Sequence, residues 1–198
     1  VKPTGTESIA DRNAADASAV ADEIRSKGFE ASSAVFSDRA SILEAVHAAA
    51  KRYGALDRML VSTLTEEPGD FLTISLEDCT RVLEDNIDTT LWFCQAAAAE
   101  MAEQPENGPS RSILLDASAC ADTQDGDDVM TTVSGWAIHG FMRSAALNLA
   151  PRNILVNAVS GTEENEDEAA ELAKALFSGE MDNVTGMTFQ INDGASML

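Results

Sequence analysis

Short apolar stretches alternate with segments of helical periodicity along this chain, and the alternation restricts the possible folds more than any other feature. Strands are predicted at residues 8–10, 31–36, 59–61, 112–115, 154–159 and 188–191. Helices are predicted at residues 14–27, 39–53, 132–150 and 169–177, with one or two more within 75–103. Strands joined by crossover helices form a parallel sheet that is covered on both faces. The sequence therefore predicts a three-layer α/β sandwich with a mostly parallel sheet.

Length and composition fit one globular domain over residues 1–198, since 44% of the residues are hydrophobic. No run approaches the roughly 18 apolar residues of a membrane span, and no basic and apolar leader opens the chain. We therefore expect a soluble cytoplasmic protein without a membrane partner. The cysteines, Cys79, Cys94 and Cys120, form no C-x-x-C pair, so neither a metal site nor a disulfide is predicted.

The chain is strongly acidic, with 34 Asp and Glu residues against 13 Lys and Arg and a formal net charge of −21. A surface of this sign repels phosphate groups, which argues against nucleic-acid binding. Adaptation to high salt and solubility combined with a basic partner surface both explain the excess. Composition alone leaves both explanations open.

Residues 131–159, TTVSGWAIHGFMRSAALNLAPRNILVNAV, are the most informative stretch for function. Their second half, from His139 onward, closely resembles a helix and the following strand of the short-chain dehydrogenase/reductase (SDR) family. Further segments resemble that family in the same order, at residues 10–28, 53–62, 82–101, 112–118 and 183–194. The resemblance implies a Rossmann-like fold.

The resemblance also implies a catalytic tetrad of Asn, Ser, Tyr and Lys, and the matching positions are Asn86, Ser118, Thr131 and Gly135. In the family, the Tyr transfers a proton and the Lys lowers its pKa. A threonine hydroxyl is far too weak an acid to replace that phenol, and glycine carries no charge. We therefore expect a degenerate tetrad with no intact catalytic set.

The cofactor-binding features of the family are also depleted. Only residues 1–5 precede the predicted sheet region, so the first βα unit and its Gly-rich turn are expected to be lacking or truncated. Asp11 matches the acid that binds the cofactor ribose, and it is either vestigial or a cap for the helix from Asn13 onward. Val35 replaces the acid at the adenine, and residues 62–65 replace an Asn-Asn-Ala-Gly segment. The expectation is no cofactor on this chain.

A shortened lid and the placement of other reactive residues support the same expectation. Thr162 leads almost directly into residues 163–169, so the substrate lid is expected to be missing. The single tyrosine, Tyr53, and the lysines, Lys2, Lys27, Lys51 and Lys174, all fall outside the predicted site. His139 shares a helix face with Gly135 and serves either as a base or in packing.

These losses predict a non-catalytic SDR subunit that assembles with an active SDR relative as a heterodimer or heterotetramer, with NAD in that partner. The arrangement resembles a hydroxyacyl-CoA dehydrogenase of toluene degradation, which pairs a competent subunit with an incompetent one. The resemblance implies interfaces at residues 86–101, 132–150 and 184–198. Two alternatives stay open: an atypical NAD(P)-dependent oxidoreductase that uses Ser118 and His139, and a homo-oligomeric scaffold.

Overall fold

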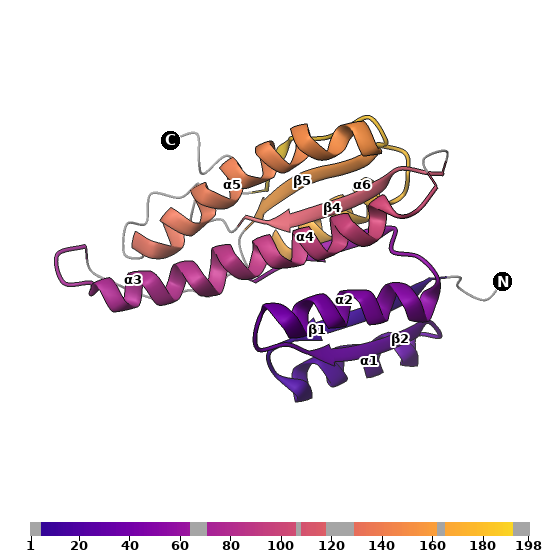
Figure 1. Ribbon diagram of the computed structural model, residues 1–198, viewed down its shortest axis with the longest axis horizontal. Coiled ribbons are helices and arrows are strands. Elements are labelled where there is room, and N and C mark those ends of the chain that lie inside the picture. Colours follow the sequence, from indigo (N-terminus) through magenta and orange to yellow (C-terminus); the bar gives the residue numbers. More distant parts are fainter. Residues whose placement is uncertain (1–4, 64–70, 106–107, 118–128, 162–164, 192–198) are drawn as a thin grey trace.

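The protein is an α/β sandwich in which helices lie on both faces of parallel strands (Figure 1). The computed structural model describes residues 5–63, 71–105, 108–117, 129–161 and 165–191. The predicted strands and helices are all present in these ranges, and their ends differ from the prediction by a few residues. The predicted Rossmann-like fold class is thereby confirmed.

The parallel strands form two separate sheets, where the sequence had suggested one. The first sheet pairs β1 (Thr6–Asp11) with β2 (Glu30–Val35), and Thr6 lies opposite Glu30. The second has the order β3-β4-β5-β6. Its strands are Arg58–Val61, Arg111–Asp116, Ile154–Gly161 and Thr188–Ile191. Among the described strands, no hydrogen-bonded pairing joins β1 or β2 to the larger sheet, and Figure 1 shows β1 and β2 as a group separate from β4 and β5.

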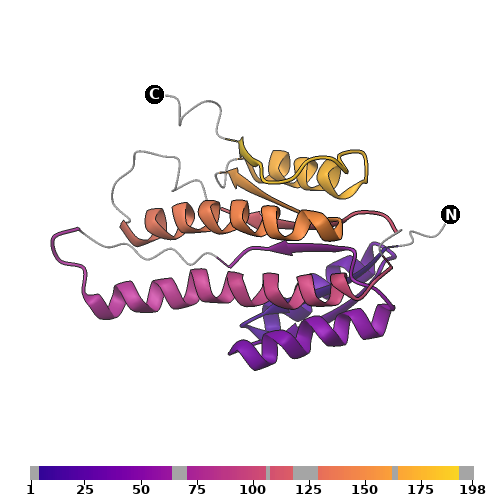
Figure 2. The same ribbon diagram turned by 45° about the horizontal axis from the view of Figure 1, so that its top comes forward.

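The helices form the two outer layers (Figure 2). The layer with the long helices contains α2 (Arg39–Tyr53), α4 (Thr89–Ala102) and α5 (Val129–Leu149). The opposite layer contains α1 (Ala14–Ser26) and α6 (Glu166–Phe177). None of these described helices is both long and apolar enough to cross a lipid bilayer.

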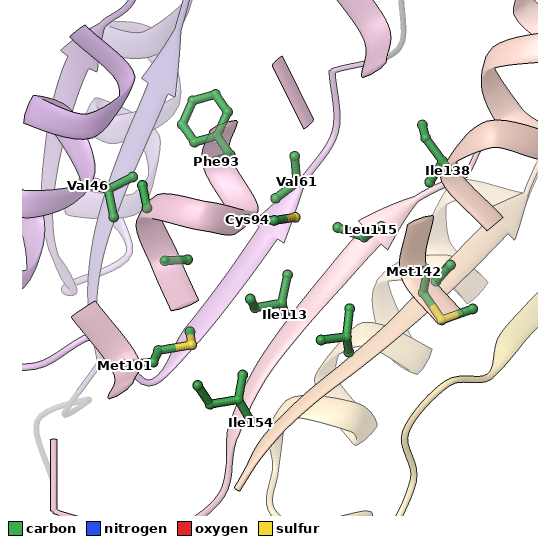
Figure 3. Packing of buried hydrophobic residues seen from close by; sticks show 14 of the residues in the cluster. Val46, Val61, Phe93, Cys94, Met101, Ile113, Leu115, Ile138, Met142 and Ile154 are labelled. Carbon is green, nitrogen blue, oxygen red and sulfur yellow. The ribbon is translucent and has the colours of Figure 1, made fainter. Parts of the chain in front are cut away.

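The central strands β4 and β5 are buried on both faces. Ile113 and Leu115 belong to the main core, which also holds residues of α2, α4 and α5 (Figure 3). Leu114, between them, points to the other face and packs in a second cluster with Leu176 of α6. Alternate side chains of one strand therefore fill two cores, as expected for a covered parallel sheet.

Local hydrogen bonds explain where the first two helices begin. Asp38 caps α2: its carboxylate accepts from the Ser41 backbone N–H at 2.8 Å, and the Ser41 hydroxyl oxygen accepts from the Asp38 N–H at 3.1 Å. At α1 the predicted cap was wrong. Asn13 is the N-cap residue, accepting from the Ala15 N–H at 2.9 Å, whereas Asp11 accepts from the Asn13 N–H at 2.7 Å. Asp11 therefore shapes the turn before the cap.

On the face of the sheet that α6 covers, side chains of the neighbouring strands β3 and β4 differ sharply in burial. Leu60 of β3 lies opposite Leu114 of β4 in the sheet register. Leu114 is 1% exposed, but Leu60 is 54% exposed. The side chain of Leu60 therefore lacks the cover that α6 gives to its neighbour.

This difference predicts unequal costs for two chemically identical substitutions. We expect Leu114→Ala to lower the free energy of unfolding by about 2–5 kcal/mol, because it opens a cavity under α6. Leu60→Ala should cost less than about 1 kcal/mol, because the side chain already contacts water. Urea denaturation of both variants measures the difference, and equal costs would show that β3 is covered in solution.

Candidate active site

An irregular turn between two helices holds the first tetrad position. α3 (Leu76–Leu83) continues through a π-helical turn, Glu84–Asp88, into α4. Such turns often occur at functional sites, because the wider turn redirects a side chain. Asn86 lies in this turn and is fully buried. The backbone carbonyl oxygen of Asn86 accepts a hydrogen bond from the Thr90 hydroxyl at 2.7 Å.

The side chain of Asn86 forms a hydrogen bond in the protein interior. Its amide nitrogen donates to the hydroxyl oxygen of Ser134 on α5 at 3.2 Å. Ser134 lies next to Gly135 and one turn after Thr131, and all three are buried. The structure therefore places Asn86 against the part of α5 that contains Thr131 and Gly135. Ser118 lies outside the described residues.

The described side chains of this cluster are poor acids and bases near neutral pH. Asn86 is neutral, Gly135 has no side chain, and a threonine hydroxyl does not release a proton near neutral pH. The nearby helix α4 also holds Cys94, but burial raises the pKa of its thiol to about 12, so it is not a thiolate. Among these described side chains, none supplies an acid or base that works near neutral pH.

Two of the residues that match the cofactor side of the family site form hydrogen bonds within the chain. The Ser62 hydroxyl donates to Asp116 Oδ2 at 2.8 Å, and the hydroxyls of Thr63 and Thr90 lie 2.7 Å apart. Val35, in the position of the adenine acid, is exposed at the end of β2. Residues 64 and 65 lie outside the described part of the chain.

Arg12 is the residue that sequence reasoning missed. Its Nη2 lies 2.9 Å from Asp85 Oδ1 and 3.0 Å from Thr89 Oγ1. Its guanidinium carbon lies 5.4 Å from the centre of the Phe36 ring. The signal available in the sequence was its place directly after Asp11, at the carboxyl end of the first predicted strand. This is the edge at which parallel α/β sheets bind ligands.

His139 is directed toward β6. Its Nδ1 lies 3.0 Å from Thr188 Oγ1, at the start of that strand, and its ring lies 5.4 Å from the ring of Trp136. Its Nε2 is buried without a hydrogen-bond partner among the described residues. A ring whose Nδ1 is held by a strand is suited to packing, and a base would need Nε2 to reach a substrate.

The other residues considered as substitutes lie elsewhere. Lys27 and Lys174 form surface ion pairs with Glu23 and Glu171, both at 2.6 Å. Lys51 is exposed on α2, and Lys2 lies outside the described residues. Tyr53 ends α2, and its buried hydroxyl has no partner among the described residues.

The Asn86–Ser134 contact predicts energetic coupling between α4 and α5. We expect Asn86→Ala to lower the free energy of unfolding by about 1–3 kcal/mol, because a buried hydroxyl loses its partner. Ser134→Ala should cost a similar amount, and the double variant less than the sum. Gln95→Ala, on the exposed face of α4, should change it by less than about 0.5 kcal/mol. Denaturant unfolding provides these values, and strictly additive costs would contradict the coupling.

Comparisons with known proteins agree on the family. A curated relative, short-chain dehydrogenase reductase 3a of Arabidopsis thaliana, is 30% identical over 117 residues, which span 59% of this chain and 44% of that protein. The chain thus matches less than half the length of this relative.

Solved structures share the fold at low identity. A dehydrogenase/reductase from Sinorhizobium meliloti 1021 is 19% identical with a TM-score of 0.84, over 97% of this chain and 95% of that one. A gluconate 5-dehydrogenase from Burkholderia cenocepacia J2315, in complex with NADP and tartrate, is 20% identical with a TM-score of 0.86, over 96% and 85%. The family model for the short chain dehydrogenase matches residues 4–176. This chain therefore belongs to the short-chain dehydrogenase family.

Proposed function

We propose that this chain is a non-catalytic SDR subunit that assembles with an active, NAD-dependent SDR. In this assembly the partner binds the cofactor and carries out the oxidoreductase chemistry. A hydroxyacyl-CoA dehydrogenase of the toluene-degradation type is the kind of partner that the sequence resemblance suggests. The chain itself contributes a folded surface and buried packing.

The buried cluster of Asn86, Thr131, Ser134 and Gly135 is the observation that carries the proposal. These residues occupy the place where a dehydrogenase of this family needs a proton donor, and the described side chains offer none. The side-chain amide of Asn86 donates to the Ser134 hydroxyl, so it stabilises the protein interior. A catalytic amide would instead be aimed at a substrate or a water chain.

The described residues that match the cofactor side of the family site also fit a dinucleotide poorly. The Asp11 carboxylate, which would receive ribose hydroxyls, accepts from the Asn13 backbone N–H at 2.7 Å. The next residue, Arg12, reaches across to Asp85 and Thr89 at the same edge. Hydroxyl groups after β3 are paired as well, with Asp116 and Thr90. A hydroxyl proton that is already donated to a partner must leave it before it can be donated to a ligand.

Exposed apolar side chains on two neighbouring helices support assembly with another chain. Neighbouring helices α3 and α5 expose large hydrophobic side chains. They are Leu76, Leu83, Val133, Trp136 and Leu147. The three on α5 share one face of that helix, and Trp136 is 58% exposed. Clustered apolar side chains of this size are typical of protein–protein contact surfaces.

Charge favours a partner different from this chain. Each copy carries a formal net charge of −21, so two copies repel each other at low ionic strength. A less acidic relative would form the same contacts without that cost. This supports a heteromer over a homo-oligomeric scaffold.

The proposal predicts a mixed assembly. An affinity-tagged copy of this chain, co-expressed with an active SDR from its own source, should co-purify with it as a heterodimer or heterotetramer in native mass spectrometry. Turnover of NAD(H) by the assembly should be lost when the partner's catalytic Tyr is replaced by Phe. It should be unchanged by His139→Ala in this chain, because the His139 ring packs against Thr188.

Two outcomes would contradict the assembly. A homo-oligomer alone, with no SDR partner, would indicate a scaffold. Saturable reduction of a carbonyl substrate by NADH on the purified chain, abolished by His139→Ala but not by Gln95→Ala, would indicate an enzyme that uses His139.

A further inference from the structure

Burial is distributed unevenly between the two sheets. In β4 every residue from Arg111 to Leu115 is buried, and in β5 every residue from Ile154 to Ser160. In contrast, β1 has no buried residue, and β2 has only Ala31. The helix between them, α1, buries only Ala17 and Ala21. Segments with few buried apolar contacts open at lower free energy than the core does.

The segment β1–α1–β2, residues 6–35, also lies apart from the larger sheet (Figure 1). Its described strands pair only with each other, so no ladder of backbone hydrogen bonds connects β1 to β3. It joins the rest of the protein through partly buried Ala10, which packs against the main core, and through the contacts of α2. Side-chain contacts must therefore hold this segment in place.

Arg12 makes the most direct polar contact of this kind. It follows β1 immediately, and it reaches Asp85 in the π-helical turn at 2.9 Å and Thr89 at the start of α4 at 3.0 Å. Thr89 is buried, whereas the side chains of Arg12 and Asp85 are 49% and 30% exposed. A half-buried ion pair with a second hydrogen bond and an aromatic neighbour contributes more than an exposed pair does.

We propose that residues 6–35 open as a separate cooperative unit and that the Arg12 contacts with Asp85 and Thr89, here called the Arg12 bridge, control this opening. In the closed state the bridge connects the end of β1 to the π-helical turn and to α4, which packs on the larger sheet. Loss of the bridge increases the population in which residues 6–35 are unfolded while β4 and β5 stay intact. Local opening of residues 6–35 goes beyond the proposed function and is independent of it, because the proposed function is tested by assembly with a partner.

Native-state hydrogen exchange read by mass spectrometry tests the proposal. In the unmodified chain, amides of α1 and β2 should exchange faster than those of β4 and β5. Arg12→Ala and Asp85→Asn should each speed exchange in α1 and β2 by roughly two- to ten-fold and leave β4 and β5 unchanged. The double variant should add little to either single one, because both remove the same contact.

Arg39→Ala is the matched control. It removes the same charge from the neighbouring helix α2, where Arg39 Nη2 lies 3.5 Å from Gln95 Oε1, the outer limit of a hydrogen bond. It should leave exchange in α1 and β2 unchanged. The proposal is overturned if all the strands exchange at one common rate, or if Arg12→Ala and Arg39→Ala have equal effects.

Discussion

The burial of β4 and β5 between two layers of helices is the constraint on which the rest of the structure depends. Ile113 and Leu115 fill one core and Leu114 fills the other, so both helical layers must dock on these strands. Docking of α4 and α5 on one face brings Asn86 beside Ser134. The geometry of the family site is therefore a consequence of core packing, and it persists whether or not catalytic groups occupy it.

Polar groups around this site are satisfied within the chain. Asn86 donates to Ser134, and the Thr63 and Thr90 hydroxyls pair. Such bonds avoid the cost of leaving buried donors and acceptors without partners. They stabilise a closed interior, whereas an active site keeps some of these groups available for a ligand. Hydrogen bonds between these polar groups within the chain agree with a subunit that has a structural role.

Periodicity was sufficient to predict the strands and helices, because each depends on local spacing of apolar residues, as in the buried strand from Arg111 to Asp116. The division into two sheets was not predicted, because strand pairing depends on contacts between distant residues. The cap at α1 was assigned to Asp11, although Asn13 has it, since both residue types are good caps. Arg12 was missed because its partner, Asp85, lies far along the chain.

The central claim, that this chain provides an SDR fold without the chemistry, is tested most directly by titrating the purified chain with NADH and following cofactor fluorescence. The account predicts no saturable change up to about 1 mM, the upper end of the range over which enzymes usually bind their substrates. Saturable binding in the micromolar range, to a chain purified without any SDR partner, would contradict it.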